Sequence, residues 1–132
     1  MKDRVVRAVC VAGMVLVASA AWAKDIFVAT TGSDTDGEGT VAAPYATLTK
    51  AVSVAEKGDV IKVAGGVYEE AVVNAVEGLR IEGSYTTDFT ARDLRNVRTV
   101  IKAPTASVDC YKTTGLTNVL SGIDFTGGKY GF

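Results

Sequence analysis

Isoleucine recurs at nearly even intervals through the second half of this 132-residue chain, and this recurrence limits the fold more than any other feature. Ile61, Ile81, Ile101 and Ile123 are separated by 20, 20 and 22 residues. A fixed period of this size is the sequence signature of a solenoid, in which each repeat stacks on its neighbours. We therefore expect the four isoleucines to occupy the same inward position on successive turns of the chain.

Each isoleucine lies in a short segment with strand character that is closely followed by glycine or proline. These segments are Val60–Val63, Leu79–Ile81, Thr99–Ile101 and Gly122–Phe125. Weaker strand signals lie between them, at Val72–Val73, Val108–Cys110 and Val119–Leu120. Two or three short strands fit a turn of about twenty residues, so the sequence predicts an all-β fold, a parallel β-helix. An antiparallel β-sandwich is the competing interpretation, because its strands also recur every 8–12 residues.

An amphipathic helix is predicted just before the first of these turns, within Pro44–Lys57. Its apolar face, at the i, i+3, i+4, i+7 spacing, is formed by Leu48, Ala51, Val52 and Ala55. Thr47 is the expected N-cap, and Gly58 is expected to end the helix. A β-helix exposes strand edges and an apolar core at its open end. We therefore expect the helix Thr47–Glu56 to cover that end.

The segment before the helix is predicted to be a strand, Asp25–Ala29, followed by a glycine-rich loop, Thr30–Thr40. Residues 24–58 are therefore expected to hold this strand, the loop and the capping helix, and residues 59–132 the β-helix coils. The sequence ends soon after a turn and without a closing cap. We expect these coils to be the first ones only, with the chain truncated at its C-terminus.

Residues 1–23 have the three parts of a secretory signal peptide. The positive residues at its start are Lys2, Arg4 and Arg7. An apolar run, Val9–Ala21, follows, and small residues at Ala21 and Ala23 suit cleavage before Lys24. The run is short for a membrane span, although a retained N-terminal anchor is the alternative. We expect a mature chain without a membrane span that is secreted, periplasmic or displayed on the cell surface.

The composition of the mature chain excludes several function classes. Histidine is absent, so a Ser-His-Asp triad, a Cys-His pair and a His-ligated metal site cannot form within the chain. Residues 24–132 carry 11 basic and 14 acidic side chains, a net charge of −3, which gives no electrostatic basis for binding nucleic acid. Cys110 is the single cysteine left after cleavage, because Cys10 lies in the predicted signal. We expect Cys110 to be buried and unpaired.

Acidic residues offer two candidate sites, and each has a structural alternative. Asp34, Asp36 and Glu38 alternate in the glycine-rich loop, an arrangement that suits calcium, but the favoured interpretation is a solvated aspartate-glycine turn. Glu69 and Glu70 are adjacent, so on a strand they face opposite sides and cannot act as one acid/base pair. We expect Tyr68 and one of these glutamates to finish a turn. No residue is therefore assigned as catalytic, cofactor-binding or metal-ligating, and no cofactor is expected.

A loop between the second and third isoleucines contains Asp88, Arg92 and Asp93, which we expect to order the loop through ion pairs. Aromatic residues could include platforms on which the apolar face of a sugar stacks. The candidates are Tyr45, Tyr68, Tyr85, Phe89, Tyr111 and Tyr130. Because they form no periodic row, packing in the core or in turns is the default interpretation.

The order of several short motifs resembles the opening segment, of unknown function, of secreted pectin-lyase-like proteins with right-handed parallel β-helix repeats. The early motifs are Phe27–Asp34, Asp36-Gly37, Ala43–Leu48, Lys50-Ala51, Gly58–Ile61 and Gly65–Tyr68. The later ones are Gly83–Tyr85, Asp88-Phe89, Arg92-Asp93, Asn96, Thr99–Ile101 and Gly122–Gly128. The resemblance implies the fold but no activity. In the lyases of that group the catalytic and calcium-binding residues lie on later coils, so none is carried over to this chain.

Three functions remain open at this point. The first is a non-catalytic secreted or surface β-helix domain whose partner is polysaccharide. The second is the N-terminal fragment of a polysaccharide lyase or glycoside hydrolase, and the third is a structural stalk or adhesin segment. We also expect self-association through the open last coil, around Gly122–Phe125, because an exposed strand edge is a template for pairing.

Overall fold

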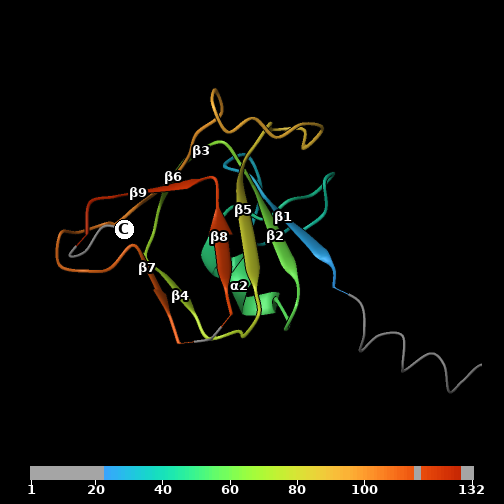
Figure 1. The fold of residues 1–132 in the computed structure, drawn as a ribbon. Helices are drawn as coiled ribbons and strands as arrows, with labels where there is room; N and C mark the ends of the chain where they lie inside the picture. Colours follow the sequence, from blue (N-terminus) through green and yellow to red (C-terminus); the bar gives the residue numbers. More distant parts are fainter. Residues whose placement is uncertain (1–22, 115–116, 129–132) are drawn as a thin grey trace, which may run out of the picture.

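A computed structural model describes residues 23–114 and 117–128, which form short strands and one short helix (Figure 1). In chain order the elements are β1 (Asp25–Val28), α2 (Leu48–Val54), β2 (Val60–Ala64), β3 (Gly66–Glu69), β4 (Val72–Asn74), β5 (Arg80–Tyr85), β6 (Thr99–Lys102), β7 (Tyr111–Thr113), β8 (Val119–Ser121) and β9 (Ile123–Thr126). The predicted signal peptide lies almost wholly outside the described residues. Within the described part of the chain, no helix has the length and apolar character needed to cross a membrane.

The strands form three parallel sheets that the chain visits in turn. Sheet A has the order β1-β2-β5-β8, sheet B the order β3-β6-β9, and sheet C consists of β4 and β7. A coil, meaning one passage through the sheets, thus runs β2-β3-β4, and the next runs β5-β6-β7. Each strand pairs in parallel with its counterpart from the neighbouring coil. This arrangement is β-helix-like. It excludes the antiparallel sandwich, because the paired strands run parallel and are joined by crossover connections.

The register of the sheets corrects the prediction for the four isoleucines. The inner row of sheet A aligns Ile26, Ile61, Ile81 and Leu120. Ile101 belongs to sheet B, where it lies between Tyr68 and Phe125. Ile123 pairs with Thr99 and occupies a different row again. Only Ile61 and Ile81 therefore stack as predicted, although Ile101 is also fully buried.

Two strand predictions between the isoleucines also need correction. Tyr68 does not finish a turn but lies buried in β3 beside the outward-facing Glu69, whereas Glu70 lies in the bend that follows the strand. The segment Val108–Cys110 precedes a strand rather than forming one, since β7 begins at Tyr111. Cys110 is nevertheless buried and free, as predicted, and its Sγ lies 3.1 Å from the backbone oxygen of Thr126. The other predicted strands are confirmed within one to four residues at their ends.

The helix α2 is shorter than the predicted Thr47–Glu56. Thr47 is the N-cap as predicted, and its hydroxyl accepts a hydrogen bond from the Lys50 amide at 3.1 Å. The helix ends at Val54 because Ala55 is already extended, so Gly58 does not end it and lies in the turn that follows. Leu48, Ala51 and Val52 are buried and belong to the core cluster with the inner residues of β1, β2 and β4.

The N-terminus of α2 is held by two carboxylates from other parts of the chain. Glu70, between β3 and β4, accepts hydrogen bonds from the amides of Leu48 and Thr49 at 2.9 and 2.8 Å. Asp34 accepts from the Ala46 and Thr47 amides and from the Thr47 hydroxyl. Carboxylates satisfy the amide groups that a helix leaves unpaired at its start. These contacts attach the helix both to the first coil and to the loop before it.

Candidate functional site

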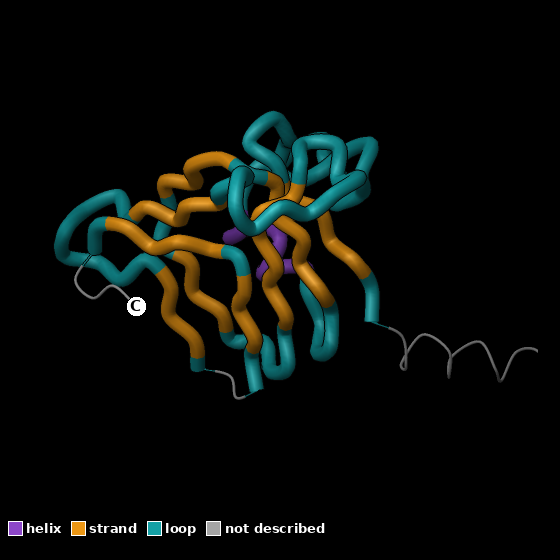
Figure 2. The backbone as a smooth tube through the Cα atoms, turned by 45° about the horizontal axis from the view of Figure 1, so that its top comes forward, coloured by secondary structure: helices purple, strands orange, loops and turns teal. Residues whose placement is uncertain are grey.

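Two long loops leave sheet A at the same edge. Because β1, β2 and β5 are parallel, their carboxyl ends meet there, and the loops 29–47 and 86–98 follow β1 and β5 directly. Figure 2 shows loops, in teal, gathered above that end of the strands. The polar and aromatic side chains near this edge, on the outer face of sheet A, form the candidate site.

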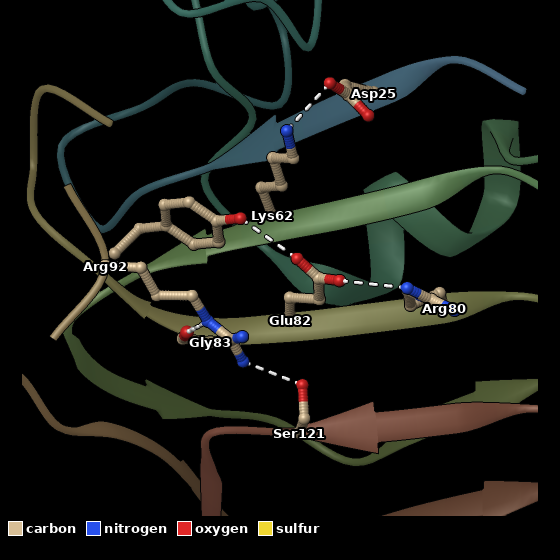
Figure 3. A network of polar contacts seen from close by, with 8 residues as sticks. Asp25, Lys62, Arg80, Glu82, Gly83, Arg92 and Ser121 are labelled. Atoms are coloured by element: carbon tan, nitrogen blue, oxygen red, sulfur yellow. Dashed lines mark hydrogen bonds and ion pairs between the residues drawn. The ribbon is translucent and has the colours of Figure 1, made fainter. Parts of the chain in front are cut away.

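The outer face of sheet A carries a row of side chains that run across the strands in register. Phe27, Lys62, Glu82 and Ser121 are aligned on β1, β2, β5 and β8. Figure 3 shows how polar contacts link this row to its neighbours. Lys62 Nζ lies 2.8 Å from an Asp25 carboxylate oxygen, and Glu82 accepts a hydrogen bond from the Tyr85 hydroxyl at 2.9 Å. Opposite charges on adjacent strands stabilise the register of the sheet by a small amount.

Lys62 lies near two aromatic rings as well as near carboxylates. Its ammonium is 5.7 Å from the ring centre of Phe27 and 5.9 Å from that of Tyr85. The hydrogen bond to Asp25 raises the pKa of Lys62 above its usual value, so the side chain is a cation at every physiological pH. A charged group over aromatic faces is attracted by their quadrupoles.

Aromatic rings from three segments meet beside this row. Phe89, on the loop 86–98, packs edge-on against Phe27 with ring centres 4.8 Å apart and lies 6.1 Å from Tyr85. Partial burial raises the pKa of Tyr85, and its hydrogen bond to Glu82 acts in the same direction. Phe89 has a positive φ of 58°, which is unusual for a bulky residue and must be held by its surroundings. The Phe89 amide donates to the Thr86 backbone oxygen at 2.9 Å, and its ring contacts Phe27 and Tyr85.

Arg92 fastens the loop 86–98 to two coils, although it forms no ion pair with Asp88 or Asp93. Its Nε donates to the Gly83 backbone oxygen at 2.8 Å and its Nη2 to the Ser121 hydroxyl at 2.7 Å, as Figure 3 shows. Its guanidinium also lies 5.7 Å from the ring centre of Tyr85. The prediction that ion pairs among these three residues order the loop is therefore wrong for the described contacts.

The two aspartates order the loop through hydrogen bonds that they accept. Asp88 accepts from the hydroxyls of Thr86 and Thr90, and these bonds lower its pKa from 3.8 to about 2. Asp93 accepts from Asn96 and from nearby backbone amides, and its pKa is also lowered. Aspartates that bond to their own turn in this way stabilise local loop geometry. Hydrogen bonds within the loop 86–98 therefore give it a defined conformation on the surface.

Two clefts lie along the loop and share one residue, Arg98. The first, of about 370 Å³, is lined by Ser84, Leu94, Arg98, Gly122, Ile123 and Asp124. The second, of about 400 Å³, is lined by Tyr85, Asn96, Arg98 and their neighbours. Arg98 forms an ion pair with Asp124 on β9, through both Nε and Nη2. The clefts therefore continue the aromatic edge of sheet A towards sheet B.

Close approach of successive coils shapes the corner beneath these clefts. A Cβ atom on Gly83 would lie 2.3 Å from the Gly122 backbone oxygen, so no side chain fits there. Ser84 follows with a positive φ of 67° and is buried, and its hydroxyl donates to the same Gly122 oxygen at 3.1 Å. The corner is therefore a fixed feature on which the loop 86–98 rests.

The other predicted candidates have structural partners. Asp34 caps α2, and its loop neighbours Asp36 and Glu38 are exposed. No cluster of three or more cysteine, aspartate or glutamate side chains in the described residues is arranged to hold a metal ion. Glu69 forms an ion pair with Lys102 at 3.0 Å, whereas Glu70 binds α2, so the two glutamates do face different partners.

The aromatic candidates fall into two groups. Tyr85 and Phe89 lie at the site, whereas Tyr68 and Tyr111 are buried in the core. Burial raises the pKa of Tyr68, whose hydroxyl donates to the Ala64 backbone oxygen at 2.8 Å. Tyr45 is half-buried and Tyr130 lies outside the described residues.

Sequence reasoning missed Phe27, Lys62, Arg98 and Asp124. The alternation of inner Ile26 and Val28 with outer Asp25 and Phe27 was the signal for the first of them. Nothing comparable marked Arg98 and Asp124, because they are 26 residues apart and meet through the pairing of sheet B.

Part of the chain matches a protein family whose function is unknown. Residues 30–81 match a family described as "Protein of unknown function (DUF1565)". A solved structure titled "The complex structure of XylC with xylose" is 34% identical over 59% of this chain, with a TM-score of 0.48. The match covers 11% of the XylC chain, so this chain spans about a tenth of that protein. None of the curated proteins matches. The family match runs from the loop before α2 through the first coil to the start of β5.

Proposed function

We propose that the chain forms an exported, right-handed parallel β-helix domain that binds polysaccharide at the loop-bearing edge of sheet A. The observation that carries the proposal is the group of Phe27, Tyr85 and Phe89 rings beside the cations of Lys62 and Arg92. Sugars present apolar C–H faces that suit aromatic rings, and hydroxyls that suit charged hydrogen-bonding groups. Rings and charged groups from neighbouring strands and a loop are in contact at this edge.

Two features of the chain support the domain type. The N-terminal residues have the pattern of a signal peptide, which agrees with a partner outside the cell. The helix α2 packs its buried face on the first strands, which agrees with a role in covering the open end of a solenoid. The unequal loops leave the strand rows in register, so the β-helix can present a binding surface without altering its core.

Binding to soluble polysaccharides tests the proposal directly. Affinity electrophoresis of the full chain in gels that contain polygalacturonate, xylan, galactan or mannan should retard the protein in at least one of them. Replacing Tyr85 with alanine should weaken that binding by roughly tenfold, because one buried aromatic contact is worth about 1–2 kcal/mol. Tyr85→Phe, which keeps the ring, should retain most of the binding.

The control is Val73→Ala, which changes an exposed residue of β4 on sheet C, away from the site. Its mobility in each gel should equal that of the parent chain. The proposal fails if the parent is retarded by none of the polysaccharides, or if Tyr85→Ala binds as tightly as the parent.

A further inference from the structure

We infer that Arg98 is the shared centre of a two-part site that selects neutral oligosaccharides over acidic ones. This inference rests on the proposed function and names the ligand class. Arg98 lines both clefts, with Leu94 and Ile123 on one side and Tyr85 and Asn96 on the other. Both volumes lie in the range of small-molecule sites. One sugar unit in each cleft places the bond between the units beside the guanidinium.

The ion pair with Asp124 determines which ligand groups Arg98 accepts. Nε and Nη2 of Arg98 both contact Oδ2 of Asp124, so Oδ1 is not used by this pair. Two neighbouring sugar hydroxyls complement such a pair, because one donates to the carboxylate while the other accepts from the guanidinium. A ligand carboxylate would be repelled by Asp124, and the positive charge that attracts it is already compensated.

The charges around the clefts are balanced in the same way. The loop 86–98 carries three cations and two anions, and the strand β9 adds a third anion. They are Arg92, Arg95, Arg98, Asp88, Asp93 and Asp124. Asp88 and Asp93 have lowered pKa values, so both remain ionised at neutral pH. Electrostatic recognition of an acidic polymer usually requires a net positive potential. A polyanion meets no such potential at these clefts.

The second cleft also offers an apolar wall for the C–H face of a sugar, whereas the exposed lining of the first cleft is mainly polar. At the first cleft Leu94 is 60% exposed overall, but polar groups make up most of the surface that faces the cleft. Tyr85 lines the second cleft, where most of the exposed surface is apolar. An apolar wall beside hydrogen-bonding groups is the lining that a neutral sugar requires, and the two clefts together provide both.

Matched oligosaccharides test the ligand class. Isothermal titration of the full chain should compare α-1,4-linked galactohexaose with hexagalacturonate, and β-1,4-linked mannohexaose with hexamannuronate. Within each pair the sugar units differ only at C6, which is a hydroxymethyl group in the neutral hexamer and a carboxylate in the acidic one. We expect at least one neutral hexamer to bind more tightly than its acidic partner. Arg98→Met should weaken this binding about tenfold, because hydrogen bonds to charged groups contribute about 1.5–3 kcal/mol.

Asp124→Asn is the specific test, since it leaves the Arg98 charge uncompensated. Affinity for the acidic hexamer should rise while affinity for the neutral one falls, and a purely structural role would not exchange the preference. The matched control is Lys102→Ala, which removes an exposed ion pair with Glu69 on the same sheet but lines neither cleft. It should leave both affinities unchanged.

The outcomes separate this inference from the proposed function. If the parent binds acidic hexamers more tightly than neutral ones, the ligand class is wrong and polysaccharide binding stands. If a neutral hexamer binds but Arg98→Met binds it equally well, the assignment to the two clefts is wrong. If no hexamer binds and no polysaccharide retards the chain, the proposed function itself fails.

Discussion

Ile81 is the central residue of the inner row of sheet A. It is fully buried and lies between Ile61 and Leu120 on the neighbouring strands. Ile81→Asp would place a charge there without a partner, at a cost on the order of 3–5 kcal/mol. Because small domains are stable by only about 5–15 kcal/mol, we expect the variant to be largely unfolded. Circular dichroism during thermal or urea denaturation measures the loss.

Val67→Asp is the matched control for this prediction. Val67 also lies on a β-strand but faces outward and is 58% exposed, so a charge there remains in water. Its unfolding midpoint should stay close to that of the parent chain. An Ile81→Asp variant that unfolds together with Val67→Asp and the parent would show that Ile81 does not stack in the core.

At the scale of single residues, the sequence predicted burial better than it predicted neighbours. Ile61, Ile81 and Ile101 are buried as expected, because apolar residues in short strands face the core. The even spacing was nevertheless misleading for Ile101. The 20 residues from Ile61 to Ile81 make one full coil within sheet A. The 20 residues from Ile81 to Ile101 instead cross the loop 86–98 and end in sheet B.

Glu70 connects the helix α2 to the first coil, and this contact can be tested at the scale of the element. Glu70→Ala removes the acceptor for the Leu48 and Thr49 amides, which are then left without this partner at the start of the helix. The expected loss of unfolding free energy is about 1–2 kcal/mol, as for other helix caps. Urea denaturation followed by circular dichroism measures it.

Glu69→Ala serves as the neighbouring control. It removes an ion pair between two largely exposed side chains, which contributes about 0–1 kcal/mol. We therefore expect Glu70→Ala to be clearly the less stable of the two variants. Equal stabilities would mean that Glu70 does not hold the helix.

At the scale of elements, most strands were predictable but the helix end and β3 were not. Period-two alternation identifies β1 and β2. The helix stops at Val54 because the chain must turn back to start β2, and Asp59 favours that turn by accepting a hydrogen bond from the Glu56 amide at 2.8 Å. The strand β3 begins at Gly66, a residue type that normally marks a turn, so the sequence predicts a turn where the structure has a strand.

The candidate site was the least predictable part, since it is assembled from pairing between distant segments. Tyr85, Phe89 and Arg92 were recognised as candidates, but their contacts with Phe27 and with the coil beneath depend on register. A single sequence indicates which residues pair across a sheet only where similar residues recur at a regular spacing. Arg98 and Asp124 have no such repeat, so their ion pair is visible only in the folded chain.

The last described coil, which contains β8 and β9, forms one end of the described structure. Tyr111, Thr113, Leu120 and Phe125 surround an apolar cavity of about 330 Å³ there. The outer edges of β7, β8 and β9 have no partner strand among the described residues. Because apolar surface and strand edges promote association, we propose that a second copy of the chain covers this end. Sedimentation velocity should detect a dimer that grows with concentration.

Leu120→Lys places a charge at this end and should shift the equilibrium towards monomer, whereas Val41→Lys, at an exposed residue of the loop 29–47, should not. A well-folded parent chain that remains monomeric throughout the concentration range would contradict the proposal.

The coils differ greatly in length, yet their strands keep the same register apart from one shift between Lys62 and Ala64 in β2. The step from Val60 to Arg80 in sheet A is 20 residues, whereas that from Arg80 to Val119 is 39. The extra residues are accommodated in segments between strands, chiefly the loop 86–98 and the segment before β7. Insertions and deletions at such corners can therefore vary freely during evolution, and grafting a foreign loop between Tyr85 and Arg98 offers a route to new recognition on an unchanged frame.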